Sequence, residues 1–306
     1  MAKIAVGSEG ASAPGASPPE PGRLEARLVA QGDGWTVDDV VCSCGPQDRP
    51  YGEQHDDVVI AIVTSGTFQY RGSGSAGREM MTPGSVLLGS PGQCFECGHE
   101  HGVGDRCLSF RFTPDYFDTI AEGTAVRGAA RTFRSLRLPP VRTLSPVIGE
   151  ACAALAGSTS FSWDELGVRL AARAVQVDRD IELDRSAVSP AAVARVTRTV
   201  RRIEAQPASG LTLVRLAQEA RLSPFHYLRT FESLTGVTPH QYLVRARLRA
   251  AALRLATESA RILDIALDAG FSDLSNFNRA FRAEFGTTPR IYRRTRGASA
   301  GAVQSR

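Results

Sequence analysis

A supersecondary unit that occurs twice near the C-terminus constrains the fold more than any other feature of this chain. Three residues recur at a spacing of fifty positions, Phe231, Gly236 and Pro239 in the first copy and Phe281, Gly286 and Pro289 in the second. In each copy an apolar-periodic segment precedes a short turn. A second segment follows, which begins at a hydroxyl or acidic residue and stops at the glycine. Helix, tight turn and capped helix in this order predict a helix-turn-helix unit.

Tandem helical units also occur in repeat arrays, but such arrays generally need at least three copies to be stable. The charge distribution separates the two interpretations. Residues 190–306 contain 19 Arg and 8 acidic residues, a net charge of +11, whereas residues 1–189 contain 17 basic and 24 acidic residues, a net charge of −7. A basic C-terminal part that carries two helix-turn-helix units favours a nucleic-acid partner.

The stretches LAQEARLSPFHYLRTFESLTGVTPHQYLVRARL and IALDAGFSDLSNFNRAFRAEFGTTPRIYRR resemble the AraC/XylS family of bacterial transcription regulators. The resemblance covers roughly the hundred C-terminal residues. It implies a double helix-turn-helix DNA-binding domain over residues 191–295 that binds double-stranded promoter DNA. It also implies an activator that works with RNA polymerase, a homodimer, and an effector whose identity the sequence does not give.

By this resemblance, the DNA contacts lie on the outward side of the second helix of each unit. The expected contacts are Ser223, Phe225, His226, Leu228 and Arg229 in the first unit, and Leu274, Ser275, Asn276, Asn278 and Arg279 in the second. Arginine can pair bidentately with guanine and asparagine with adenine. A helix over about residues 239–257, about 28 Å long, would place the two helices in successive major grooves, about 34 Å apart. The aromatic residues of these helices, Tyr227, Phe231, Phe277, Phe281 and Phe285, are predicted to be core.

The 306 residues are enough for two domains, and we expect an α+β chain. Residues 1–22, rich in Gly, Ala, Ser and Pro, are predicted to be a disordered leader. Residues 23–113 carry short strand-like runs, and their Pro83-Gly84 and Pro91-Gly92 turns resemble those of cupin barrels, which are often the sensors of this family. The predicted strands are 24–30, 36–42, 58–63, 66–71, 85–88 and 107–112.

Residues 114–180 are predicted to be a helical accessory or dimerisation region, with helices over 114–120, 140–156 and 163–177. In the last of these, Trp163, Leu166, Leu170, Ala174 and Val177 form one stripe. That stripe either covers the barrel, forms a dimer contact, or does both. Residues 181–190 are a predicted linker, a new helix begins after Pro190, and 296–306 form a disordered tail. No apolar run approaches about 18 residues, so no membrane partner is expected, and a cytoplasmic location follows.

Cysteine and histidine concentrate in one stretch of the N-terminal half. The candidate metal ligands there are Cys94, Cys97, His99, His101 and Cys107, and Cys42 and Cys44 could join them in space. Thiolate and imidazole ligands suit Zn²⁺, Cu(I) or another thiophilic metal ion, although the sequence identifies no certain cofactor. Two alternatives stay open. The cysteines could form a redox switch, which needs thiols of low pKa, or they could be buried beside a pocket for an organic effector.

Enzymatic chemistry finds little support in the sequence. There is no G-x-S-x-G, no phosphate-binding G-x-x-x-x-G-K-[ST] and no dinucleotide-binding fingerprint, so we expect no catalytic residues. A metal-dependent cupin enzyme fused to a DNA-binding domain is the enzymatic alternative. It would have only His55, His99 and His101 as histidine ligands, and we expect His55 to be exposed. A second alternative is an architectural DNA-binding protein.

Overall fold

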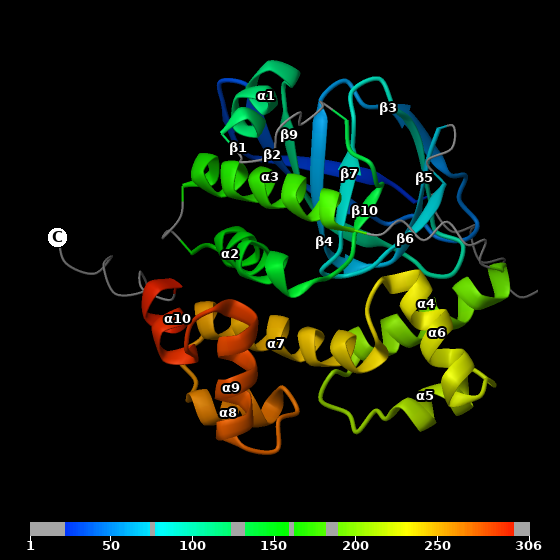
Figure 1. Ribbon diagram of the computed structural model, residues 1–306, viewed down its shortest axis with the longest axis vertical. Helices are drawn as coiled ribbons and strands as arrows, with labels where there is room; N and C mark the ends of the chain where they lie inside the picture. The colour runs from blue at the N-terminus through cyan, green and yellow to red at the C-terminus, as the bar shows by residue number, and fades with distance from the viewer. Residues whose placement is uncertain (1–21, 74–76, 124–131, 159–161, 182–188, 297–306) are drawn as a thin grey trace, which may run out of the picture.

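The computed structural model describes residues 22–73, 77–123, 132–158, 162–181 and 189–296 (Figure 1). The chain forms a β-rich N-terminal domain and an all-helical C-terminal domain, as the α+β prediction requires. The predicted disordered leader and tail and most of the predicted linker lie outside the described residues. No helix of the described residues is both long and apolar enough to cross a bilayer.

The N-terminal strands form two antiparallel sheets. The six-stranded sheet contains, in spatial order, β1 (Leu24–Gly32), β2 (Trp35–Cys42), β9 (Asp105–Phe112), β4 (Val58–Gly66), β7 (Val86–Gly89) and β10 (Arg137–Leu138). The four-stranded sheet contains β3 (Tyr51–Gln54), β8 (Cys94–Gly98), β5 (Phe68–Gly72) and β6 (Arg78–Met81). The predicted barrel is therefore two separate sheets with side chains of both packed between them.

Four of the strands, β3, β6, β8 and β10, have no counterpart among the predicted strands. The two-residue β10 is an edge of the six-stranded sheet, and the other three belong to the four-stranded sheet, where β3 and β6 are the two edges. All four residues of β3 are exposed, and its sequence, YGEQ, has no apolar alternation. An exposed edge strand does not need alternating apolar and polar residues, so its sequence does not indicate a strand. The strand conformation of β3 is shown only by its pairing with β8.

Helices cover the six-stranded sheet on the side that faces the C-terminal domain (Figure 1). They are α1 (Pro114–Glu122), a 3₁₀ helix (Arg142–Leu144), α2 (Ser145–Leu155) and α3 (Trp163–Asp180). On α3, Leu166, Leu170 and Ala174 are buried in the core that the sheet forms, and Trp163 and Val177 pack against it. The predicted stripe thus covers the sheet. Asp178, near the C-terminal end of α3, is buried and accepts hydrogen bonds from Arg134 and Ser135.

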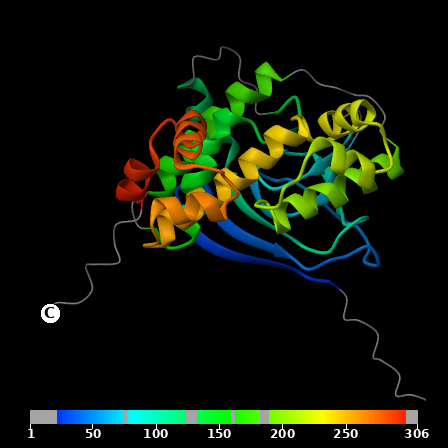
Figure 2. The ribbon, with the colours of Figure 1, turned by 90° about the horizontal axis from the view of Figure 1, so that it is seen from below.

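The C-terminal domain consists of two helix-turn-helix units joined by one long helix. Its helices are α4 (Pro190–Ala205), α5 (Leu213–Glu219), α6 (Pro224–Thr235), α7 (Pro239–Thr257), α8 (Ile262–Asp268), α9 (Leu274–Phe285) and α10 (Pro289–Arg296). Figure 2 shows α7 running between α5 and α6 at one end and α8 and α9 at the other. Each unit has its own aromatic core, around Tyr227 and Phe231 in the first and around Phe277 and Phe281 in the second.

Capping side chains and glycines set the ends of the second helix of each unit. Ser223 accepts a hydrogen bond from the backbone N–H of His226, and Asp273 accepts one from that of Asn276. Gly236 and Gly286 end the two helices in the left-handed conformation, with φ of 75° and 72°, which glycine adopts without a steric penalty.

Several polar contacts hold the two domains together. Arg137 of β10 donates to Glu79 at 2.8 Å and to the carbonyl of Thr235, the last residue of α6, at 2.9 Å. The carboxylate of Glu284 on α9 accepts from Ser145 of α2 at 2.5 Å and from Arg245 of α7 at 3.2 Å. Both units are therefore bonded to the N-terminal domain at the C-terminal ends of α6 and α9.

The two phenylalanines of α6 allow a test of core against surface on one helix. Phe231 is fully buried whereas Phe225 is 69% exposed. We expect Phe231→Ala to lower the free energy of unfolding by about 3–5 kcal/mol because it leaves a cavity in the core. Phe225→Ala should change it by less than about 0.5 kcal/mol. Urea unfolding followed by circular dichroism measures both, and an equal loss in the two variants would contradict the assigned orientation of α6.

Candidate nucleic-acid interface and sensor cavity

The predicted contact residues of α6 lie on its solvent-exposed side. Phe225, His226 and Arg229 are exposed, and Leu228 is half-buried. The guanidinium of Arg229 lies 6.0 Å from the centre of the Phe225 ring, which makes the two side chains one surface feature. Ser223 is also exposed, but its hydroxyl already caps the helix. The opposite side of α6 packs into the core. This burial, and not the predicted contact residues, determines the orientation of α6.

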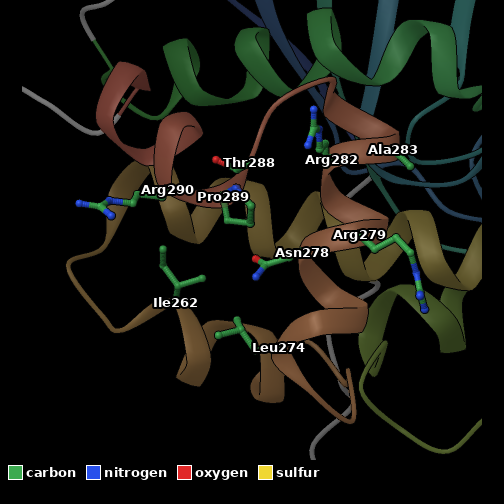
Figure 3. A pocket seen from close by; sticks show the side chains of 9 residues that line it. All are labelled: Ile262, Leu274, Asn278, Arg279, Arg282, Ala283, Thr288, Pro289 and Arg290. Atoms are coloured by element: carbon green, nitrogen blue, oxygen red, sulfur yellow. The ribbon is translucent and has the colours of Figure 1, made fainter.

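On α9, the predicted contact residues divide between two sides of the helix. Figure 3 shows Leu274 and Asn278 on the side that faces a groove, while Arg279 extends from the other side. Arg279 donates to the side-chain oxygen of Asn276 at 3.2 Å, so these two side chains orient each other. Ser275 is exposed beside them.

The groove lies between α8, α9 and α10 and has a volume of about 760 Å³. Ile262 and Pro289 lie at the starts of α8 and α10, and three arginines, Arg279, Arg282 and Arg290, contribute to the lining (Figure 3). The sequence prediction did not include Arg282 and Arg290, although Arg282 lies one helical turn from Arg279 and Asn278. Cationic side chains at this position can neutralise a phosphate backbone while α9 contacts base edges.

A cavity of about 700 Å³ lies between the two sheets of the N-terminal domain. Both sheets supply its apolar walls, with Val59, Ala61 and Leu87 from the six-stranded sheet and Phe68 and Phe95 from the four-stranded sheet. Its volume is in the range that small-molecule sites in proteins usually have. The cavity opens among polar residues of the β2–β3 and β3–β4 connections, which include Asp48, Glu53 and Asp57.

His55 lines this cavity, so the prediction that it is exposed is wrong. It is 9% exposed, its Nε2 lies 2.7 Å from the hydroxyl of Tyr70, and its ring stacks on Phe95 with 4.1 Å between the ring centres. Burial lowers the pKa of His55 from its ordinary value of 6.5 to about 4, against the opposing effect of Glu53 and Asp56. His55 precedes β4, and the strand pairing that encloses it cannot be read from neighbouring residues.

The structure brings part of the predicted metal-ligand set together at one end of the cavity. Cys42, Cys97, His99 and Cys107 lie there with Asp105, and Cys44 lines the same cavity. The ligating atoms of Cys42, His99 and Asp105 all lie within 4.8 Å of one another. The sequence analysis missed Asp105, because a single acidic residue six positions after His99 carries no ligand spacing.

Two residues of the predicted set do not join this group. Cys94 is exposed, because it lies on β8 three residues before Cys97, and an odd spacing on a strand places side chains on opposite faces. His101 follows the end of β8 and lies near Thr67 and Thr197, at the boundary with α4. On this strand the three-residue spacing of Cys94 and Cys97 therefore separates the two thiols instead of directing them to one metal ion.

The thiols of the group differ from those that a redox switch requires. Burial raises the pKa of Cys42 to about 12 and also raises the pKa of Cys97 and Cys107 well above the ordinary thiol range. A reactive switch needs thiols with a lowered pKa. Of the three histidines named for the cupin-enzyme alternative, His55 and His99 line the cavity.

Comparisons with known proteins agree with this division of the chain. Residues 216–295 match a helix-turn-helix domain model and residues 43–174 match an AraC-like ligand binding domain model. The probable transcription factor PqrA of Proteus vulgaris is 37% identical over 84 residues, which are 28% of this chain and 69% of PqrA. The chain belongs to the AraC/XylS family. Its two matched regions fall on the two sites described above, the ligand-binding match around the cavity and the helix-turn-helix match around α6 and α9.

A second curated relative is similar over a smaller share of its length. The transcriptional regulator Rob of Salmonella typhimurium is 36% identical over 94 residues, 31% of this chain and 32% of Rob. The chain thus spans about a third of the length of this curated relative. Among solved structures, ToxT of Vibrio cholerae is 13% identical with a TM-score of 0.36, over 88% of this chain and 100% of ToxT.

The buried His55 gives a pH dependence that can be measured. Between pH 6.5 and about 4 the unfolded chain protonates His55 while the folded chain does not, so the free energy of unfolding falls as the pH drops through this window. In His55→Gln that contribution is absent, and the pH profile should be flatter than that of the wild type. Urea unfolding at several pH values tests this, and an unchanged slope in the variant would show that His55 titrates normally.

Proposed function

We propose that this protein is a sequence-specific transcription regulator whose N-terminal cavity binds a small effector. The observation that carries the proposal is the pair of capped helices, α6 and α9. Their predicted DNA-contacting residues are exposed or half-buried, while Tyr227, Phe231, Phe277, Phe281 and Phe285 of the same helices are buried. Base-edge readers must be accessible, and the helices that present them must be held rigidly. Both conditions are met in each unit.

The spacing of the two helices follows from α7. Its 19 residues give a length of about 28 Å at 1.5 Å per residue. Successive major grooves on one face of B-DNA are about 34 Å apart, so α6 and α9 can enter two neighbouring grooves from the ends of α7. Arg229 and Arg279 would then approach guanines, and Asn276 or Asn278 would approach adenine.

Phosphate contacts would set the affinity. Arg282 and Arg290 in the groove between α8, α9 and α10 are placed to meet the backbone beside α9. The net charge of +11 over residues 190–306 attracts DNA through long-range electrostatic interaction. Each phosphate that the protein neutralises makes binding more sensitive to salt. Such phosphate contacts do not distinguish one base sequence from another. Sequence specificity would depend on the residues of α6 and α9.

Activation of transcription through RNA polymerase, and a homodimer, belong to this proposal on the ground of family membership. A dimer surface is available on the outer side of α3. Val168, 36% exposed, lies there in a shallow groove that Tyr116 and Ile120 of α1 also line. The inner side of the same helix covers the sheet, so one helix can serve both roles that its sequence pattern allowed.

Replacement of Arg279 separates base reading from phosphate binding. We expect Arg279→Ala to weaken binding to a selected target duplex by about 1–3 kcal/mol and to relax the preference at one base position, with little change on random duplex. Arg71→Ala, which removes an exposed arginine of β5, should leave both affinities unchanged. Fluorescence anisotropy at fixed salt measures them. An equal loss on selected and random duplexes would show that Arg279 contacts only phosphate.

A further inference from the structure

The three buried groups at the inner end of the sensor cavity offer three different ligand types at one point. Cys42 offers a sulfur, His99 an imidazole nitrogen and Asp105 a carboxylate oxygen, all within 4.8 Å of one another. The side chains of His99 and Asp105 are only 4% and 8% exposed, and His99 Nε2 lies 2.6 Å from Asp105 Oδ1. Cys107 lies beside them, with its Sγ 3.5 Å from the other oxygen of Asp105.

The fold supplies these groups from both sheets. Cys42 on β2 is directly opposite Asp105 on β9, and opposite residues of an antiparallel pair point to the same face. Cys107, two residues further along β9, shares that face. His99 follows the end of β8, which belongs to the other sheet. The group therefore forms only when the two sheets pack face to face, with Cys42 and Asp105 placed by strand pairing and His99 supplied by the β8–β9 connection.

Charge in the cavity favours a cation. Five carboxylates line it, Asp48, Glu53, Asp56, Asp57 and Asp105, against the two guanidinium groups of Arg49 and Arg111. The charge of Arg111 is already paired with that of Asp38, to which its guanidinium donates a hydrogen bond at 2.7 Å. An acidic, partly enclosed cavity concentrates cations.

We propose that Cys42, His99 and Asp105 bind a thiophilic divalent metal ion, with Zn²⁺ the best match, and that this ion is the effector of the regulator. Sulfur, imidazole and carboxylate together are ligands that zinc accepts in a tetrahedral site, whereas Mg²⁺ and Ca²⁺ prefer oxygen alone. The fourth position faces the cavity, where Cys107 or a cavity molecule completes the coordination. The effector role rests on the proposed function, while the metal site stands on the geometry alone.

Metal binding must move the connection between β8 and β9. Two atoms bound to one tetrahedral zinc at about 2.0–2.2 Å lie about 3.3 Å apart. His99 Nε2 and Asp105 Oδ1 are 2.6 Å apart, so both cannot bind the ion until they separate. The backbone of Asp105 is held in the β2–β9–β4 ladder, so any backbone displacement that accompanies this separation falls on His99 and the residues between them.

That same connection is held by the DNA-binding domain. Arg201 of α4 donates to the carbonyl oxygen of Val103 at 2.7 Å. Its guanidinium also fills the space beside Gly102, where any side chain would collide with it. A shift of residues 99–104 is therefore transmitted directly to α4, whose Val196 and Val200 belong to the core of the first helix-turn-helix unit.

Metal binding is tested on the purified full-length protein with zinc chloride alone, by competition with a chromophoric chelator, and with Co²⁺ as a spectroscopic probe. We expect one Zn²⁺ per chain and a sulfur-to-cobalt charge-transfer band. Cys42→Ser and Asp105→Asn should each weaken zinc binding more than about 10-fold, and Cys42→Ser should reduce the intensity of the band. Cys94→Ser, which changes an exposed cysteine of the same domain, should change neither.

Absence of zinc binding by the wild type would overturn the site, as would binding that persists unchanged in both Cys42→Ser and Asp105→Asn. Loss of the cobalt band in Cys94→Ser would place the ion elsewhere and overturn it as well. Circular dichroism of each variant shows whether it has folded. If Cys42→Ser does not fold, Asp105→Asn, which keeps the size and shape of the side chain, decides the question.

The effector role is tested with a duplex that the full-length protein selects from random sequence. Saturating zinc should change the affinity for this duplex within the range of about 5- to 150-fold that is typical of coupled sites. Arg201→Ala should still bind zinc but lose most of this change. No zinc effect in the wild type would overturn the effector role. If no duplex is selected with or without zinc, the proposed function fails, while the metal-binding result remains separate.

Discussion

The packing of α7 between the two units and the N-terminal domain is the constraint on which the rest of the structure depends. Its buried apolar residues lie on more than one side of the helix, with Tyr242 and Ala246 in the core of the first unit and Leu248 and Leu255 in that of the second. The hydroxyl of Tyr242 also donates to the carbonyl of Pro83, in the N-terminal domain. One helix therefore contributes to both cores and also contacts the N-terminal domain. The separation of α6 and α9 is therefore a consequence of core packing.

Partly buried charges reinforce this arrangement near the domain boundary. Arg249 of α7 bonds to Glu204 of α4 at 2.6 Å, and its guanidinium occupies the space beside Gly84 of the N-terminal domain, where a side chain would collide. The boundary is thus able to transmit a change in the N-terminal domain, because polar groups with specific partners cannot slide past one another without loss. Arg137, Arg201 and Glu284 extend the same type of contact to α6, α4 and α9.

Some of the local structure was predictable because the determining residues are neighbours in the chain. The glycines that end α6 and α9 and the N-cap Ser223 act within a single helical turn, and the strands with apolar runs, such as β4 and β9, bury those runs. For the second unit the sequence left Ser272 and Asp273 as alternative caps, and the structure assigns the role to Asp273. Arg221 has φ of 55°, where the second unit has Gly270 at 91°, so the two turns have the same shape although only one has the residue that such a turn favours.

The sequence by itself determined the two helix-turn-helix units, their exposed readers and the family, because helix periodicity, caps and motif residues are local properties. Tertiary structure alone decided the sensor site. Three features of this site depend on which strands pair and which faces meet. Cys42 and not Cys94 lies beside His99, His55 is buried, and Asp105 belongs to the group. Those pairings join residues tens of positions apart, and no spacing within a segment encodes them.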